Sequence, residues 1–490
     1  MSINLKDPVV EVREARLNSI TGYCGSAKEL CRRSHGPQGC PMLDQQRAFT
    51  QCISCSANQV MNQLVFIQDA AVVEHGPAGC SGDIPGRNIT GRSGRKKRGL
   101  PVHNIHYINT NLDEKDIIYG GAEKLQEAIR EAKVRFSPNV IFVTTTCASA
   151  IIGDDVSGIC DRMEKEVGVP VVSISCEGFR SKVWATGFDA AYHGILRKLV
   201  KPPRKKDPGM INVINFQGRD VFSEPFRQLG LWPNYIVPYT TVERLSHISE
   251  AAASVQICST LGTYLAAGLE EYYGVPEVKS PLPFGTAGTD AFYRELGRVT
   301  HHEEEAERYI QYEHARIAPE LEELRRQLQG KRAFIGAGAA HAHAMAAIVR
   351  ELSMELVGNC VWHHDAVFDN GDARSDTLAH DVEKFGDFNI DICNKQSYEL
   401  VNMLNRTRPD IYIARHAGTR WASMLGIPSF LMADEHFGLG YQGLLRLGRL
   451  IADTISHRRF VQNIAAHSKL PYTQWWLEQD PTFFLGGDAE

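Results

Sequence analysis

The sequence predicts an α/β fold with parallel sheets, because one short pattern occurs three times along its 490 residues. In each copy an apolar strand is followed by a Cys or His and then by a helix that ends at Gly-x-Pro. Glycine past the last helical residue and proline beyond it stop a helix for steric reasons. Open parallel sheets bind ligands at the carboxyl ends of their strands, so each copy puts a potential metal ligand at such an end. These ligands are Cys147, Cys258 and His416.

The chain is too long for one hydrophobic core, so we expect several domains. A basic, proline-bearing linker at 202–209 and a new strand starting near 331 mark two boundaries. We expect three similar α/β domains between a cysteine-rich N-terminal segment and a C-terminal tail that packs on another domain or subunit. The predicted ranges are 1–54, 55–205, 210–328, 331–455 and 456–490.

Hydrophobic periodicity and helix-stop signals predict the elements in order. Helices are expected over 116–136, 155–167, 259–274 and 418–425, and strands over 139–145, 169–176, 254–257, 331–338 and 410–414. The basic run RNITGRSGRKKRG at 87–99 has two interpretations. It is either a solvated loop or a docking surface for an acidic protein partner.

Composition excludes some functional classes. The net charge of −5 argues against general nucleic-acid binding. No window is long and apolar enough for a membrane span, and the N-terminus lacks a signal-peptide pattern, so we expect a cytoplasmic protein. In a reducing compartment its 12 cysteines are metal ligands, catalytic thiols or buried apolar residues rather than disulfides. We assign Cys160, Cys360 and Cys393 to the buried group.

Residues 50–80 contain three cysteines that are candidate metal ligands. Cys52 and Cys55 form a C-x-x-C pair, and Cys80 ends the turn EHGPAGC, which repeats SHGPQGC at Cys40. A C-x-x-C pair alone fits zinc, a redox couple or an iron–sulfur ligand set. No second pair follows at zinc-finger spacing, so zinc is the weakest of the three.

Two nucleotide-binding motifs are incomplete or missing. Gly336-Ala337-Gly338 follows a strand but continues AAHAHAM without the third glycine of a dinucleotide site. The sequence has no GxxxxGK[ST], so the chain itself does not bind ATP through a P-loop. An NAD-dependent Rossmann enzyme stays the least favoured alternative.

Several stretches together resemble the α-type subunit of nitrogenase and nitrogenase-like reductases, over about 55–443. They are EHGPAGC, LDEKDIIYGGAEKL, TTTCASAIIGDD, SCEGFR and VQICSTLGTYLAAGLEEYYGVP. The resemblance implies three Rossmann-like domains around a central metallocluster. It also implies an α2β2 heterotetramer with a homologous β-type subunit, and a separate ATP-hydrolysing [4Fe-4S] reductase that supplies electrons.

The resemblance also implies ligands. Cys55, Cys80 and Cys147 match the α-subunit ligands of the [8Fe-7S] P-cluster, with Cys52 as a rival to Cys55. Cys258 matches the thiolate of the active-site cluster, a large nitrogenase-cofactor-like group for which [8Fe-9S-C] is one candidate. His436 is the favoured imidazole ligand of that cluster and His416 is the reserve. The residues do not specify a heterometal or homocitrate.

Departures from nitrogenase point to another substrate. Trp184 and Phe188 stand where nitrogenases carry Gln and His, which makes a more apolar cavity suited to an organic substrate. His341 and His343, expected on a loop of the third domain, are candidate proton donors. Among nitrogenase-like systems the chain is most similar to the α-type subunit of methylthio-alkane reductase, which cleaves small thioethers to methanethiol and a hydrocarbon in sulfur metabolism.

Two alternatives to this hypothesis stay open. A nitrogenase-cofactor assembly scaffold would hold a cluster without catalysis, and a nitrogenase α subunit proper would reduce dinitrogen. Three P-cluster-type cysteines favour the enzyme over the scaffold. Cys24, Cys31 and Cys40 have no assigned role beyond burial or an additional iron–sulfur ligand.

Overall fold

The computed structural model describes residues 3–20, 22–34, 55–181, 183–392, 397–415, 418–432 and 437–479. The chain forms two compact units. The first comprises Met1–Arg16, Ile53–Ile257 and Leu261–Val278, and the second comprises Leu17–Cys52, Cys258–Thr260 and Lys279–Glu490. No helix among the described residues is long and apolar enough to cross a membrane.

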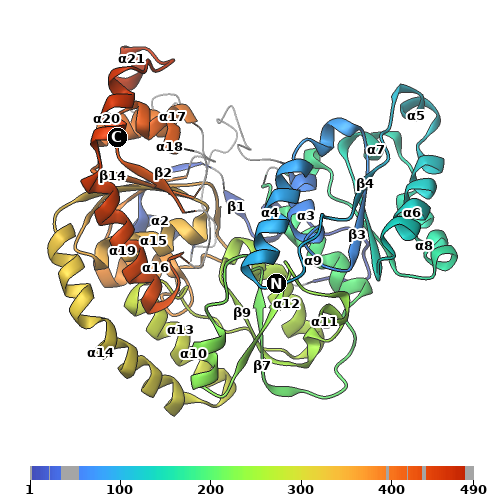
Figure 1. Ribbon diagram of the computed structural model, residues 1–490, viewed down its shortest axis with the longest axis horizontal. Helices are drawn as coiled ribbons and strands as arrows, with labels where there is room; N and C mark the ends of the chain where they lie inside the picture. Colours follow the sequence, from blue (N-terminus) through green and yellow to red (C-terminus); the bar gives the residue numbers. More distant parts are fainter. Residues whose placement is uncertain are drawn as a thin grey trace. The chain divides into compact units, whose positions relative to one another are not determined.

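The first unit contains a four-stranded parallel sheet in the order β4-β3-β5-β6. Its central strands β3 and β5 are buried along their whole length, as expected for strands covered on both faces. Helices α6 and α8 cover one face, and α3 and α9 cover the other (Figure 1). The bounds are β3 Ala70–His75, β4 Tyr107–Asn109, β5 Val140–Thr145, β6 Val171–Ile174, α3 Ser56–Leu64, α6 Ala122–Phe136, α8 Val156–Val167 and α9 Thr186–Lys198.

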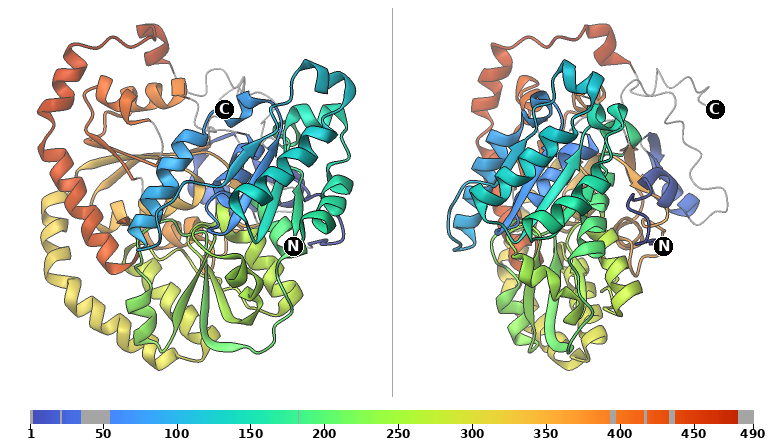
Figure 2. Two further views of the ribbon diagram at one scale, coloured as in Figure 1. Left: turned by 45° about the vertical axis from the view of Figure 1, so that its right-hand side comes forward. Right: turned by 90° about the vertical axis from the view of Figure 1, so that its right-hand side faces the viewer.

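A second parallel sheet of the first unit has the order β8-β7-β9 (Figure 2). The long apolar helix α12 follows its edge strand β9, so the loop between them lies at a strand's carboxyl end. The bounds are β7 Asp207–Ile214, α10 Ser223–Gln228, β8 Trp232–Ile236, α11 Val242–Ser246, β9 Ala251–Gln256 and α12 Ser259–Tyr273.

The second unit contains the largest sheet, in the order β15-β14-β10-β11-β13-β2. Five of its strands run parallel, and β2 pairs antiparallel with β13 through the register Cys24↔Asp391. The bounds are β2 Tyr23–Ser26, β10 Arg332–Ala337, α15 Ala339–Glu351, β11 Glu355–Val361, α16 Thr377–Phe385, β13 Asn389–Ile392, α17 Ser397–Thr407, β14 Ile411–Ala414, α18 Thr419–Met424 and β15 Ser429–Leu431.

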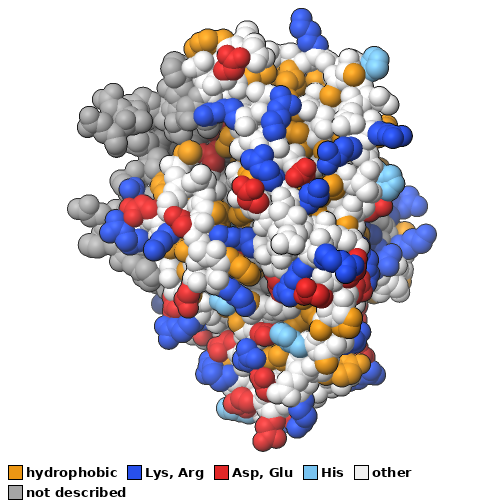
Figure 3. Space-filling model, turned by 90° about the vertical axis from the view of Figure 1, so that its left-hand side faces the viewer, with side chains coloured by type: hydrophobic (Ala, Val, Ile, Leu, Met, Phe, Trp, Pro, Cys, Tyr) orange, Lys and Arg blue, Asp and Glu red, His pale blue; other side chains and the backbone are white. Residues whose placement is uncertain are grey.

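Three long helices of the second unit, α13 (Gly285–Thr300), α14 (Glu303–Leu328) and α19 (Gly440–Ser456), pack against one another. Charges of both signs are interspersed over the face in Figure 3, and α14 carries many i,i+3 pairs such as Arg308 with Glu305. After α20 (Arg459–Ala466), the last helix α21 (Gln474–Glu478) packs on α17, where Trp476 contacts Tyr398 and Val401.

The predicted α/β class with parallel sheets is confirmed, and two local predictions are wrong. The helix expected over 116–136 is two helices, α5 (Glu114–Tyr119) and α6, because Gly120 has φ 92° and breaks the helix. The basic run at 87–99 is not a loop: most of it lies in helix α4 (Ile84–Lys97), which buries Arg87 and Arg95.

Helices α3 and α9 approach closely because Gly187 has no side chain. A Cβ at Gly187 would lie 2.2 Å from the carbonyl oxygen of Ser56, a backbone atom that cannot rotate away. We therefore expect Gly187→Ala to lower the free energy of unfolding by about 2 kcal/mol or more. Gly86→Ala, at an open position of α4, is the control and should be neutral or slightly stabilising. Equal denaturation midpoints for the two variants would contradict this packing.

Candidate functional site

Three cysteine-bearing segments meet in the first unit, at the carboxyl ends of the strands of its four-stranded sheet. Cys80 lies in a 3₁₀ turn, Ala78–Ser81, that follows β3. Cys147 begins helix α7 (Cys147–Ile152) just after β5, and Cys55 is the N-cap of α3. Because β3 and β5 pair in parallel through His75↔Thr145, their carboxyl ends lie side by side.

The predicted P-cluster cysteines come together at this edge. A Cβ built on Gly178, in the loop after β6, would lie 3.2 Å from Sγ of Cys55 and 3.5 Å from Sγ of Cys147. Partial desolvation raises the pKa of Cys80, and the charges of Glu74, Cys55 and Cys147 raise it further. The side chain of Cys80 is exposed in the isolated chain, and no disulfide joins any two of the described cysteines.

Side-chain hydrogen bonds tie the three loops to one another. Thr146 Oγ1 donates to the carbonyl of His75 at 3.1 Å, which joins the Cys147 loop to the Cys80 loop. Thr145 Oγ1 donates to Glu177 Oε1 at 2.8 Å, which joins the Cys147 loop to the SCEGFR loop. A Cβ at Gly76 would lie 2.3 Å from Thr146, so this contact requires glycine. These contacts connect the Cys147 loop to both the Cys80 loop and the SCEGFR loop.

Sequence reasoning missed the acids and histidine beneath these loops. His75 Nε2 lies 3.0 Å from Asp154 Oδ2, and Asp154 also accepts from the backbone N–H of Gly121. Burial lowers the pKa of His75, although Asp154 opposes that shift. The signal was present in the motifs EHGPAGC and IIGDD, but only the fold shows that these residues meet.

Trp184 and Phe188 are buried at the start of α9, with exposed fractions of 7% and 4%. Their ring centroids are 5.7 Å apart in an edge-to-face arrangement. The two rings therefore pack against each other, and the apolar cavity expected beside them stays a prediction.

Cys258 lies in the loop between β9 and α12 and is 6% exposed. Its position at the carboxyl end of a parallel strand is the one predicted. Cys160 and Cys360 are buried, as expected. The predictions for five further residues concern positions outside the described residues: His436, His416, Cys52, Cys40 and Cys393.

Cys24 and Cys31 belong to the second unit, whereas the three clustered cysteines belong to the first. Cys24 is exposed in β2, and Cys31 is buried in helix α2 (Ala27–Ser34). Burial raises the pKa of Cys31 strongly, with nearby Asp376 and Asp369 adding to the shift. Such a thiol is a poor metal ligand because only the thiolate binds metal.

The prediction that His341 and His343 lie on a loop is wrong. Both lie in the first turns of helix α15, because the glycine-poor run AAHAHAM favours a helix, and both are buried. The rings of Phe284 and His341 are in an edge-to-face arrangement, with centroids 6.2 Å apart. Among the described residues, neither ring nitrogen of His343 has a hydrogen-bond partner.

Two further buried imidazoles, which sequence reasoning missed, follow the neighbouring strand β11. These are His363 and His364. Burial lowers the pKa of His343 to about 3, and His364 and His363 contribute to the shift. Burial likewise lowers the pKa of His364 to about 4, with Asp365 opposing. At neutral pH both imidazoles are therefore uncharged.

These shifts make the stability of the second unit depend on pH. An unfolded histidine titrates near pH 6.5, so below that value the unfolded chain binds protons that the folded chain does not. The unfolding free energy should fall as the pH drops from about 6.5 towards 4, by about 1.4 kcal/mol per pH unit for each of His343 and His364. Denaturant titrations between pH 7.5 and 5 would measure this slope.

A matched pair of variants identifies the source of the slope. His343→Gln should reduce the pH slope of the unfolding free energy by about 1.4 kcal/mol per pH unit, which is the contribution of one histidine. His467→Gln, at an exposed position of the second unit, should leave it unchanged. An unaltered slope in His343→Gln would exclude this buried imidazole as the cause.

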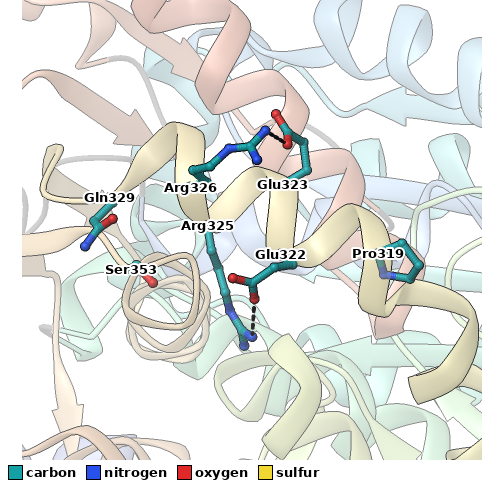
Figure 4. A pocket seen from close by; sticks show the side chains of 7 residues that line it. All are labelled: Pro319, Glu322, Glu323, Arg325, Arg326, Gln329 and Ser353. Carbon is teal, nitrogen blue, oxygen red and sulfur yellow. Dashed lines mark hydrogen bonds and ion pairs between the residues drawn. The ribbon is translucent and has the colours of Figure 1, made fainter.

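A polar groove of about 400 Å³ lies elsewhere in the second unit, along α14. Its charged side chains pair with one another, Arg326 with Glu323 and Arg325 with Glu322 (Figure 4). None of the predicted site residues lines it. The groove therefore has no connection with the predicted chemistry.

Comparison with known proteins places this geometry in a family. The sequence model of the family of nitrogenase component 1 type oxidoreductases matches residues 55–456. The chain belongs to this family. It is 30% identical over 411 residues to the nitrogenase molybdenum-iron protein alpha chain of Methanococcus maripaludis, covering 79% of this chain and 83% of the relative.

Another component 1 relative has a different role. The nitrogenase iron-molybdenum cofactor biosynthesis protein NifE of Methanococcus maripaludis is 27% identical over 462 residues, 90% of this chain and 89% of the relative. Among solved structures, nitrogenase Cp1 at pH 5 has the same fold, with a TM-score of 0.68, 21% identity, and coverage of 87% of this chain and 91% of that chain. The chain is therefore a member of an oxidoreductase family. The relatives in this family include both an enzyme subunit and a cofactor biosynthesis protein.

Proposed function

We propose that this chain is the α-type subunit of a nitrogenase-like reductase that cleaves C–S bonds of small thioethers. The observation that carries the proposal is the convergence of Cys55, Cys80 and Cys147 at one sheet edge, next to the bare backbone of Gly178. Among the described residues, no three His, Cys, Asp or Glu side chains converge on a single metal ion.

The donor set fits an [8Fe-7S] P-cluster that is shared with another chain. Three thiolates are an incomplete ligand set for such a cluster, and a homologous β-type subunit in an α2β2 heterotetramer supplies the rest. The exposure of Cys80 in the isolated chain supports this division. When bound, the cluster supplies one-electron transfer, with electrons delivered by a separate ATP-hydrolysing [4Fe-4S] reductase.

Exposed apolar side chains around the cysteines support a covering partner. Ile118 and Tyr119 of α5, Ile151 of α7 and Phe179 beside Gly178 are 73%, 85%, 77% and 61% exposed. Helices α5 and α7 contact each other, so these side chains come from adjoining segments. Apolar groups gathered in this way usually mark a protein interface.

In the proposed active site, Cys258 would hold a large iron–sulfur cluster, and the imidazole of His436 would be the second ligand, with His416 in reserve. Trp184 and Phe188, which are buried in the first unit, would supply apolar surface suited to a thioether. Neutral His341 and His343 each carry one N–H and one acceptor nitrogen, so each can pass a proton on. For dimethyl sulfide the balance is one C–S bond broken, two electrons and two protons consumed, and methane and methanethiol formed.

A second candidate function is supported by the similarity to NifE, which extends over 90% of this chain. A cofactor-assembly scaffold would hold a cluster at Cys258, release it to another protein and reduce nothing. A nitrogenase α subunit proper would instead reduce dinitrogen to ammonia.

One anaerobic experiment separates these functions. The chain is purified with its partner subunit, its iron is counted, and reductase, ATP and dimethyl sulfide are added. The enzyme proposal predicts a cluster-replete complex that forms methane and methanethiol in equal amounts. Iron without either product, together with transfer of the cluster to an apo-protein, would favour the scaffold. Ammonia from dinitrogen would favour a nitrogenase, and an iron-free complex would overturn all three functions.

A further inference from the structure

We propose that Glu74 sets the charge around the metal group at Cys80, and that its buried carboxylate lowers the reduction potential of that group. The inference rests on the proposed function, because it requires an iron–sulfur cluster held by Cys80. Glu74 lies in the EHGPAGC turn motif at the end of β3, six residues before the cysteine. It acts on the cluster through its field and through the turn, so it is a positioning residue.

The carboxylate lies beneath the cysteine turn and is 3% exposed. Its Oε2 accepts hydrogen bonds from Tyr107 Oη at 2.5 Å, Ser81 Oγ at 2.9 Å and Asn109 Nδ2 at 3.0 Å. Ser81 directly follows Cys80, and Asn109 Nδ2 also lies 2.8 Å from Ser81 Oγ. The network therefore joins β3, β4 and the Cys80 turn through one side chain.

The arrangement is that of an ionised carboxylate. An ionised carboxylate only accepts hydrogen bonds, and all three partners donate to it. Among the described residues, no Lys or Arg forms an ion pair with Glu74, although the buried guanidinium of Arg87 lies within reach of its field. Burial and the Glu74 charge together raise the pKa of Tyr107 strongly, so the phenol stays protonated and continues to donate.

The charge of Glu74 reaches the thiol. Ser81, the residue directly after Cys80, donates to Glu74 Oε2 at 2.9 Å, so the carboxylate lies against the turn that carries the thiol. Reduction of a cluster bound there adds one electron, and a fixed negative charge nearby repels that electron. The repulsion makes the reduced state less stable, so the cluster becomes a stronger electron donor to the next site.

Two variants separate the charge from the shape of the turn. In Glu74→Gln the amide oxygen still accepts hydrogen bonds but the negative charge is lost, so the midpoint potential should shift to more positive values. In Tyr107→Phe the charge remains and one compensating donor is lost, so the potential should shift to more negative values. A purely structural role predicts no such opposition of sign. Glu131→Gln, at an exposed position of α6, is the control and should leave the potential unchanged.

The test is a potentiometric titration of the anaerobic αβ complex followed by electron paramagnetic resonance, with iron counted in every sample. Full iron with an unchanged potential in Glu74→Gln would overturn the inference and leave the proposed function standing. A wild-type complex that lacks iron at Cys80 would overturn both. If Glu74→Gln loses its iron, Tyr107→Phe decides: a negative shift supports the inference, and no shift or a positive shift overturns it.

Discussion

Replacing Cys258 with alanine is expected to abolish thioether reduction while the iron at Cys55, Cys80 and Cys147 stays in place. Cys258 lies at the carboxyl end of β9 and is assigned to the second unit, whereas the three clustered cysteines belong to the first. Loss of even an indirect partner of a metal ligand costs roughly 10- to 100-fold in activity or affinity, so loss of the thiolate itself should cost more than roughly 100-fold. The measurement is methane formation alongside the resonance spectrum of each cluster.

The control for this variant is Cys160→Ala. Cys160 is 1% exposed and belongs to an apolar cluster beside β5 and β6, so the same chemical change there removes no ligand. Its activity should remain close to that of the wild type. Full methane formation by Cys258→Ala would exclude Cys258 as the anchor of the reactive cluster.

Replacing Cys147 with alanine should remove the relay cluster, and substrate reduction should stop even though the Cys258 cluster remains. Cys147 begins α7, and its sulfur and that of Cys55 both lie close to Gly178, so Cys147→Ala removes one of the three proposed ligands. We expect the iron count to drop by the content of one P-cluster and the P-cluster resonance to disappear. Iron analysis and spectroscopy of the anaerobic complex check both.

Cys176→Ala is the matched control for Cys147→Ala. Cys176 lies in the adjoining SCEGFR loop, is fully buried, and donates its S–H to the carbonyl of Thr145. Burial raises its pKa well above the usual value, which disfavours the thiolate that a metal needs. This variant should keep its iron. Equal iron loss in both variants would indicate a general collapse of the loops and not the loss of a specific ligand.

Much of the fold could be predicted because its signals are local. The buried run at 140–145 and the glycine stop at Gly168 fall where the sequence pattern places them. The break at Gly120 was missed because helical periodicity continues on both sides of it. Helix α4 was missed because a run of basic residues resembles a solvated loop. The buried Arg87 instead donates to the carbonyl of Asn58 and to Asn62 Oδ1 of α3, a tertiary contact that no local pattern reveals.

The site could be predicted only as far as its motifs extend. Cys80 and Cys147 stand in recognisable motifs, and the resemblance to the nitrogenase family implied their grouping. The network of Glu74 with Tyr107 and Asn109 could not be predicted, because its members lie 33 and 35 positions apart and no periodicity links them. The burial of His343 was hidden for a similar reason: alanine-rich helices occur both in cores and on surfaces.

The pairing of β2 with β13 has a consequence for folding while the chain is being synthesised. Cys24 and Asp391 are register partners. A ribosome adding about 5–20 residues per second needs roughly 20 to 70 s to extend the chain from Cys24 to Asp391. During that interval β2 has no strand to join and presents an open edge. Slower or paused translation lengthens the interval, so the yield of native protein should depend on codon usage in the middle of the gene and on chaperones that bind nascent N-termini.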